Sequence, residues 1–172
     1  MVATQQKVYI SYARREDKKY KEYMEEFFKD LIFNKTVKDK YVDLDYSSDY
    51  INKLIDEDYI NEYSLLIVLI GKHTKYKKYV DWEIYAGLKQ KAYVIGILLP
   101  EIKVDNRRYK YGDIPIRLAD NVKSGYSKVY TWEDAIGNFE ELLRMMYQNK
   151  IELEDNINNS RECMLTSVEE YS

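Results

Sequence analysis

Two stretches of the chain are apolar without interruption, and both read as buried strands. Residues 64–71 (SLLIVLIG) and 92–100 (AYVIGILLP) are continuous apolar runs that end at a glycine and a proline. Such runs are typical of strands buried on both faces of a parallel sheet. Shorter strand-like runs occur at residues 7–13, 41–47 and 127–132. We therefore predict five strands.

The segments between these strands carry helical patterns. Apolar side chains fall on one helical face in residues 16–33, 79–90 and 133–150. A further helix is expected after the second strand, where Ser47 or Ser48 can act as its N-cap. Strands and helices therefore alternate along the chain.

This alternation predicts an α/β fold, a flavodoxin-like doubly wound parallel sheet of five strands with helices on both faces. Residues 101–126 hold most of the turn residues without a clear period, and we expect one long loop there. We assign residues 7–150 to this domain. Residues 151–172 form a polar C-terminal tail, either a mobile terminus or an arm that binds a partner. Sheets of this kind bind ligands at the C-terminal ends of their strands.

Composition narrows the class of protein. The 172 residues suit one domain, and a net charge of -3 argues against a general nucleic-acid binder. A single cysteine, Cys163, and a single histidine leave little for a disulfide framework or a metal site. No signal segment opens the chain, and its apolar runs are too short to span a bilayer. We expect a cytoplasmic protein that binds no membrane and needs no metal or cofactor.

Several common catalytic motifs are absent. No GxGxxG follows the first strand, GKHT lacks the upstream glycine of a phosphate loop, and there is no GxSxG elbow. A phosphotransfer receiver would want an acidic pair after the first strand and a phospho-acceptor aspartate after the third. Here the first strand leads into SYARRED, and the third ends in GKHT without an aspartate, which disfavours that function. A flavin-binding domain has support from the fold alone, and no Ser/Thr-rich phosphate loop follows the first strand.

One acid lies where this fold would place a ligand. In YVDWEIYAGL, residues 79–88, Val80 and Leu88 belong to the core face, while Glu83 lies at its edge, one turn after Tyr79. The helix N-terminus nearby favours the ionised carboxylate. Glu83 is either an ordinary glutamate at the edge of a helix or a catalytic group. Its place at the ligand-binding end of the sheet favours the catalytic interpretation.

The segments VYISYARRED (8–17) and SLLIVLIGKHTKYKKYVDWEIYAGLKQKAYVIGI (64–97) together resemble the Toll/interleukin-1 receptor (TIR) fold. More closely, they resemble the TIR-like ThsB subunits of Thoeris anti-phage defence systems. The VLIG strand, followed by an aromatic residue and the Glu-Ile pair of the next helix, is the most specific part. Tyr79 stands where many TIR domains have tryptophan, so the position stays aromatic.

The resemblance implies an NAD+ glycohydrolase or ADP-ribosyl cyclase. Enzymatic TIR domains cleave the nicotinamide–ribose bond of NAD+ with one glutamate, which corresponds to Glu83. Nicotinamide leaves as a neutral molecule, so one carboxylate that stabilises the oxocarbenium-like ribose is sufficient. By the same resemblance, a phage-derived trigger switches the enzyme on. Its product, an ADP-ribose derivative expected to be cyclic, activates a separate effector.

Seven further side chains are candidates for contact with NAD+, because they lie at strand ends or beside Glu83. They are Tyr9, Ser11, Tyr12, Asp45, His73, Tyr79 and Trp82. Tyr9 can equally point into the core, and Asp45 can cap the next helix. Trp82 can pack against a neighbouring loop, and His73 can be an ordinary surface residue.

A competing function is that of a non-catalytic TIR-like scaffold, which acts through homotypic TIR–TIR assembly. TIR domains do both, and some need self-assembly to complete the active site. A short chain without a fused effector domain suits a stand-alone signal-producing enzyme better than a receptor adaptor.

Overall fold

A parallel sheet forms the centre of the protein. The computed structural model describes residues 6–33, 63–106 and 108–165. Four strands form one continuous sheet, and a strand of two residues pairs with the outer side of the first, in the order β2-β1-β3-β4-β5. The strands are β1 (Gln6–Ser11), β2 (Ile32–Phe33), β3 (Leu65–Ile70), β4 (Tyr93–Leu98) and β5 (Lys128–Thr131).

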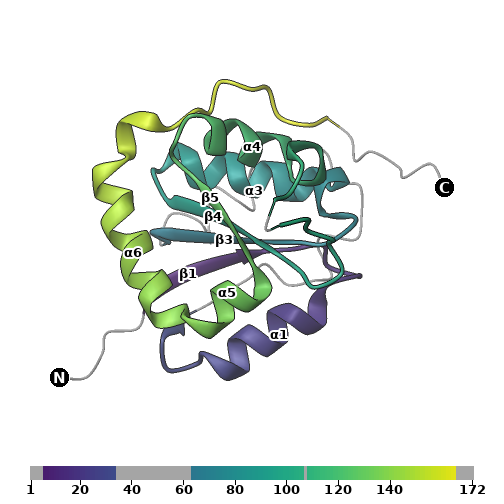
Figure 1. The fold of residues 1–172 in the computed structure, drawn as a ribbon. Helices are drawn as coiled ribbons and strands as arrows, with labels where there is room; N and C mark the ends of the chain where they lie inside the picture. Colours follow the sequence, from purple (N-terminus) through teal and green to yellow (C-terminus); the bar gives the residue numbers. More distant parts are fainter. Residues whose placement is uncertain (1–5, 34–62, 107, 166–172) are drawn as a thin grey trace.

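Helices cover the two faces of this sheet. Figure 1 shows α3 and α4 on one face and α1 and α5 on the other, with α6 continuing from α5. The helices are α1 (Lys18–Phe27), α3 (Lys78–Lys89), α4 (Ile116–Lys123), α5 (Trp132–Gly137) and α6 (Phe139–Glu152). Short 3-10 turns are η2 (Thr74–Tyr76), η3 (Tyr111–Asp113) and η4 (Glu154–Asn156). Within the described ranges, every helix is too short or too polar to serve as a transmembrane span.

The predicted α/β class and parallel sheet are confirmed. The two continuous apolar runs form β3 and β4, which pair in parallel and are buried at every position. Burial on both faces explains why these strands show no alternation of polar and apolar residues. The strand predicted at residues 41–47 and the helix predicted after it lie outside the described residues. Four of the five predicted strands are therefore confirmed.

The first helix is shorter than predicted. Residues 16–33 were expected to be helical, but α1 ends at Phe27, and the last two residues of that range form β2. The apolar helical face predicted within residues 16–33 includes both Phe27 and Phe28. Phe27 is 65% exposed, whereas Phe28 is buried and stacks on Phe139 of α6. Neighbouring residues of a helix point about 100° apart, so the two rings do not share one direction.

Residues 101–126 do not form the single loop that the sequence predicted. They contain α4, whose inward face includes Leu118 and Ala119 but also Arg117 and Asn121. Two polar residues at buried positions interrupt the apolar period by which a helix is recognised. The prediction was wrong because those two residues are buried through hydrogen bonds rather than through apolar contact.

The last predicted helix, at residues 133–150, is two helices. α5 ends at Gly137 and α6 begins at Phe139, so the break falls at Asn138. Glycine and asparagine are poor helix formers, which explains the position of the break. Trp132, predicted to end a strand, begins α5 instead, and the Thr131 hydroxyl caps that helix by accepting a hydrogen bond from Asp134 N–H at 3.2 Å.

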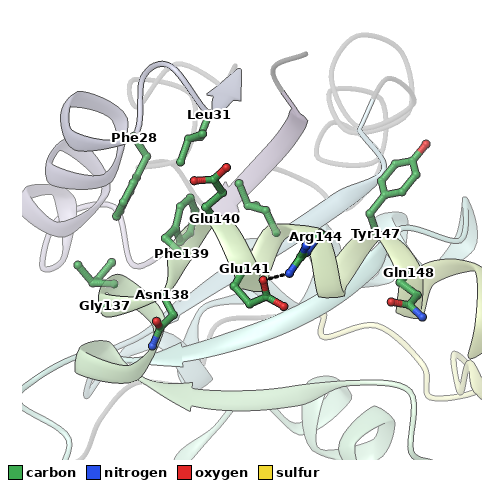
Figure 2. A pocket seen from close by; sticks show the side chains of 12 residues that line it. Phe28, Leu31, Gly137, Asn138, Phe139, Glu140, Glu141, Arg144, Tyr147 and Gln148 are labelled. Atoms are coloured by element: carbon green, nitrogen blue, oxygen red, sulfur yellow. Dashed lines mark hydrogen bonds and ion pairs between the residues drawn. The ribbon is translucent and has the colours of Figure 1, made fainter. Parts of the chain in front are cut away.

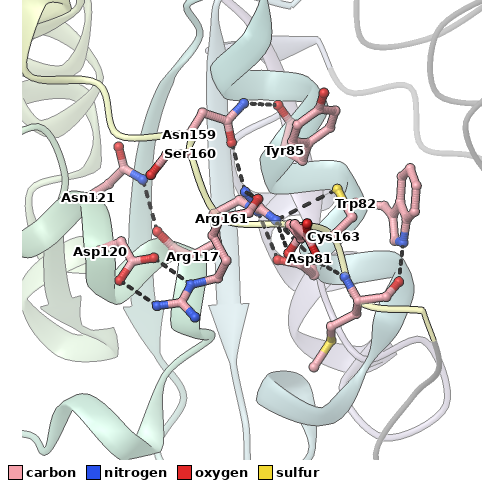
Figure 3. A network of polar contacts seen from close by, with 12 residues as sticks. Asp81, Trp82, Tyr85, Arg117, Asp120, Asn121, Asn159, Ser160, Arg161 and Cys163 are labelled. Carbon is pink, nitrogen blue, oxygen red and sulfur yellow. Dashed lines mark hydrogen bonds and ion pairs between the residues drawn. The ribbon is translucent and has the colours of Figure 1, made fainter.

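The chain returns along α3 and α4 after α6. We call residues 158–164 the C-terminal segment. Asn158 exchanges two hydrogen bonds with the Asn121 side chain of α4, and Met164 N–H donates to Asp81 of α3. These residues were interpreted as part of a mobile terminus or of an arm for a partner. In the structure they contact the protein's own helices (Figure 3).

Candidate functional site

Glu83 lies in the second turn of α3 and faces the C-terminal end of β1. The Ser11 hydroxyl, on the last residue of β1, donates a hydrogen bond to Glu83 Oε1 at 3.3 Å. The sequence placed Glu83 at the edge of the core, but only 2% of its surface is exposed. The prediction of an edge position was wrong because the loop after β1 folds over the carboxylate.

Arg14 is the residue of that loop that covers Glu83. Its Nη2 lies 3.2 Å from Glu83 Oε2 and 3.3 Å from Oε1, so the two side chains form a buried ion pair. The guanidinium carbon lies 4.5 Å from the centre of the Tyr12 ring and 5.3 Å from that of Tyr79. The Tyr79 hydroxyl accepts a hydrogen bond from Arg14 N–H at 2.9 Å.

Sequence reasoning missed Arg14. The segment SYARRED carries part of the resemblance to TIR domains, but no role was predicted for either of its arginines. A signal was present, because Arg14 comes directly after the strand-like run of residues 7–13, at the edge where ligands bind. A cation so placed is a candidate partner for an acid on a neighbouring element.

Burial sets the electrostatics of this cluster. It raises the pKa of Glu83 above the ordinary glutamate range, and the Arg14 guanidinium opposes that shift. Burial also raises the pKa of Tyr9, and the charge of Glu83 raises it further, so this phenol stays neutral. Burial alone would lower the pKa of Arg14, but Glu83 and the surrounding tyrosines raise it, so the guanidinium stays charged.

Five of the predicted site residues therefore form one cluster with Arg14, which we call the Glu83 cluster. They are Tyr9, Ser11, Tyr12, Tyr79 and Glu83. Tyr9 is fully buried, which fits the interpretation that it points into the core. It is also close enough to Glu83 for the carboxylate charge to raise the pKa of Tyr9. Its hydroxyl interacts with the Glu83 carboxylate but makes no hydrogen bond of normal geometry to the described residues.

Two other predicted residues lie elsewhere. The Trp82 indole N–H donates to the Met164 carbonyl at 2.7 Å, so this ring faces the C-terminal segment rather than Glu83. His73 precedes η2 and lies beside the carboxyl groups of Glu16 and Asp17. Asp45 lies outside the described residues. The alternative interpretation of Trp82, packing against a neighbouring segment, therefore fits the structure.

A second group of acids lies at the loops that leave β1, β3 and β4. A Cβ atom on Gly71 would come within 2.4 Å of Asp17 Oδ2 and 2.6 Å of Glu101 Oε1, so the two carboxyl groups face the same glycine. Burial, with the nearby charges of Glu101 and Glu16, raises the pKa of Asp17 to about 6. Gly71 is therefore the residue that lets these loops meet.

A separate pocket of about 900 Å³ opens between the turn that follows α1 and the helices α5 and α6. Figure 2 shows its mixed lining of aromatic and charged side chains, in which Arg144 pairs with Glu141. It is lined by Phe28, Leu31, Ile136, Gly137, Asn138, Phe139, Glu140, Glu141, Leu143, Arg144, Tyr147 and Gln148. No residue of the Glu83 cluster lines it, so the two features are distinct.

The Glu83 cluster can stabilise a cation and hold hydroxyl groups. It offers one carboxylate, one serine hydroxyl, a guanidinium and three tyrosines. Within the described ranges, no group of three or more His, Cys, Asp or Glu side chains is placed to hold a metal ion. The groups that this cluster offers for chemistry are the carboxylate and the side chains that can position a ligand against it.

The parallel α/β sheet with helices on both faces has the fold expected of a TIR-like domain. The family model "Thoeris protein ThsB, TIR-like domain" matches residues 9–103, more than half of the chain. The chain therefore belongs to the TIR-like ThsB family, and this membership suggests a role in anti-phage defence. The match covers both Arg14 and Glu83. A search of curated proteins found no match.

Proposed function

We propose that this protein is an anti-phage TIR enzyme that cleaves the nicotinamide–ribose bond of NAD+. It makes an ADP-ribose-derived, cyclic signal that activates a separate effector. The observation that supports this proposal most is the Glu83 carboxylate, buried at the ligand-binding edge of the sheet with a serine hydroxyl and an arginine. A buried carboxylate in such a place is far more costly than a surface one, which favours a functional role.

Glu83 would stabilise the positive charge that develops on the ribose. As the bond from C1′ to the pyridinium nitrogen breaks, its electron pair goes to that nitrogen, and nicotinamide leaves neutral. The ribose becomes oxocarbenium-like, and a carboxylate in a dry site stabilises such a cation strongly. The Ser11 hydroxyl, 3.3 Å from Glu83 Oε1, would help to hold the carboxylate or a ribose hydroxyl.

Arg14 would have to leave Glu83 when the substrate enters. The guanidinium now covers the carboxylate at 3.2 Å, and both side chains are almost fully buried. A diphosphate offers Arg14 a better partner, since a guanidinium binds phosphate oxygens with paired hydrogen bonds. NAD+ carries both a diphosphate and a cationic ring. When NAD+ binds, Arg14 can therefore leave the Glu83 carboxylate and bind the diphosphate. The cationic ring of NAD+ then takes the place of Arg14 beside Glu83.

The two tyrosines under Arg14 can accept that cationic ring. Tyr12 and Tyr79 present their faces to the guanidinium at 4.5 Å and 5.3 Å. A nicotinamide ring in NAD+ is flat and positively charged, as a guanidinium is, and aromatic faces attract both. After cleavage the ring is neutral and this attraction is lost, which favours its release. The acceptor at C1′ is then water or the adenine of the same molecule, and its proton passes to solvent.

The test compares the wild type with Glu83→Gln in bacteria challenged with a panel of phages. Small nucleotides in filtered lysates are profiled by mass spectrometry, and survival of the culture is measured. We expect an ADP-ribose derivative and protection in the wild type, and neither in Glu83→Gln. Glu26→Gln, a change at an exposed glutamate on α1, should behave as the wild type does.

Two outcomes would contradict this proposal. A Glu83→Gln variant that is folded, makes no nucleotide and still protects would favour the non-catalytic scaffold, which acts through TIR–TIR assembly. A nucleotide product that is the same in both proteins would remove Glu83 from the chemistry. The mass of any product separates simple hydrolysis from cyclisation, because the cyclic product lacks one water.

A further inference from the structure

Arg117 of α4 is the largest fully buried side chain of the described residues. Its Nε and Nη2 lie 2.9 Å and 3.3 Å from the two carboxylate oxygens of Asp81 on α3. The Tyr85 ring lies against the same guanidinium, with its centre 5.2 Å away. Figure 3 shows this ion pair between the two helices. A buried ion pair by itself adds little net stability, so this pair is a candidate for a role other than stabilising the fold.

The C-terminal segment supplies the remaining partners of this ion pair. Arg117 Nη1 donates to Asn159 Oδ1 at 3.0 Å and to the Arg161 carbonyl at 2.8 Å, and Nη2 donates to the Glu162 carbonyl at 3.1 Å. In return, Asp81 Oδ2 accepts a hydrogen bond from Met164 N–H at 2.8 Å. The ion pair and the segment therefore form one unit that is satisfied only when the segment is in place.

This unit also contacts α3 at two residues that follow Asp81 in the sequence. Trp82 donates its indole N–H to the Met164 carbonyl at 2.7 Å, and Asn159 Nδ2 donates to the Tyr85 carbonyl at 3.1 Å. Asp81 and Glu83 are two residues apart, so their side chains leave the helix on nearly opposite sides. The segment thus holds one side of α3 while Glu83 faces β1 on the other. No side chain caps the N-terminus of α3.

We propose that the C-terminal segment, anchored by Arg117, positions Glu83 by fixing the first turns of α3. Arg117 is a positioning residue in this scheme, and its effect on turnover rests on the proposed function. Glu83 meets its partners at 3.2–3.3 Å across the interface between α3 and the end of β1. A displacement of the helix by about 1 Å would break those contacts and is enough to cost a reaction about 100-fold.

The test removes the anchor without leaving a buried charge. Asp81→Leu with Arg117→Met replaces both charges by apolar side chains, a change that proteins often tolerate because neither partner is left unpaired. The matched control is Asp120→Asn with Arg161→Gln. That pair also joins the segment to α4, but it is more exposed and does not touch α3.

Hydrogen exchange, followed by mass spectrometry, gives a readout that does not depend on activity. We expect the amides of residues 78–89 to exchange about tenfold faster in the Asp81/Arg117 double variant, with β3 and β4 unchanged. The control variant should match the wild type. Asn159→Ala, which removes two partly buried hydrogen bonds of this unit, should give a smaller change in the same residues. If the double variant does not fold, the exchange of α3 in Asn159→Ala tests the proposal instead. Unchanged exchange in α3 would overturn the proposal.

Kinetics then test the consequence for Glu83. With NAD+, we expect kcat of the double variant to fall about 100-fold with little change in KM. A loosened α3 admits water, so the acid limb of its rate–pH profile should move down toward the ordinary range of glutamate. A merely structural role would lower the amount of active enzyme and leave that limb in place. If the wild-type protein from infected cells does not cleave NAD+, the proposed function is contradicted. The hydrogen-exchange data would still test whether the C-terminal segment fixes α3, because they do not depend on activity.

Discussion

Arg14 and Glu83 neutralise each other in a place that water does not reach. Only 5% of the Arg14 surface and 2% of the Glu83 surface are exposed. Each charge therefore depends on the other, because an unpaired buried charge carries a large desolvation cost. At the edge of the core, where the sequence placed Glu83, a Glu83→Gln change would leave the fold undisturbed. The buried ion pair changes that expectation.

We now expect Glu83→Gln to lower the free energy of unfolding by about 3 kcal/mol, because it leaves Arg14 buried without a counter-charge. Arg14→Gln should cost a similar amount for the opposite reason. The double variant, with both charges removed, should be clearly more stable than either single one. Urea denaturation of the four proteins measures this coupling. Additive effects of the two changes would mean that the pair contributes nothing to stability.

The sequence indicated some residues of the candidate site and missed others, and Glu83 and Arg14 show why. Glu83 became a candidate because it lies at the edge of an apolar helical face, within a recognisable motif. Arg14 was missed because a lone arginine in a loop carries no periodic signal. Its partner stands 69 residues further along the chain, so only folding brings the two together. The same holds for Arg117, whose partners come from α3 and from the C-terminal segment.

The contact between β4 and α4 depends on a residue without a side chain. A Cβ atom on Gly96 would lie 2.7 Å from Ile70 Cδ1 and 2.9 Å from Leu118 Cδ2. Both distances are shorter than atoms tolerate, so a methyl group here must displace either α4 or a side chain of β3. Gly96 therefore sets how closely α4, with Arg117, approaches the sheet.

Gly96→Ala is accordingly expected to destabilise the protein by about 1–3 kcal/mol through overpacking. Gly137→Ala is the matched control, since nothing lies within 4 Å of the methyl group it would add at the end of α5. There the better helix propensity of alanine should give a neutral or slightly stabilising change. Thermal unfolding of both variants makes the comparison. Equal stability of the two would show that the sheet relaxes around the extra methyl group.

Elements were predicted well where their pattern is apolar and poorly where it is polar. The third helix was expected at residues 79–90 and is found at Lys78–Lys89. By contrast, α4 was taken for a loop, because hydrogen bonds rather than apolar contacts bury part of its inward face. A pattern of hydrophobicity cannot report burial that is achieved by satisfied polar groups.

Three loops at one end of the molecule meet around Asp17, and its carboxyl links their packing to pH. Asp17 is buried, and its pKa of about 6 is raised by that burial and by Glu101 and Glu16. An ordinary aspartate in the unfolded chain titrates near pH 4. Between those values the folded state holds a proton that the unfolded state has lost. The free energy of unfolding therefore falls as the pH rises through this window.

Asp17→Asn cannot ionise, so it should remove this part of the pH dependence. We expect the variant to exceed the wild type by about 1–2 kcal/mol at pH 7, and to lose that advantage below about pH 4. Unfolding at a series of pH values measures the difference. Glu101→Gln should have a smaller effect in the same direction, since it removes one of the charges that raise the pKa of Asp17. A difference that is constant with pH would contradict the role of Asp17 ionisation.

The sequence by itself determined the α/β class, the two buried central strands, the helix that carries Glu83 and the family. These features rest on local periodicity and on a contiguous motif, both of which are properties of neighbouring residues. Only the tertiary structure decided that Glu83 is buried, that Arg14 covers it and that the C-terminal segment is bound to α3 through Arg117. Those contacts join residues far apart in the chain. Their partners are selected by charge and geometry in three dimensions, which no spacing in the sequence encodes.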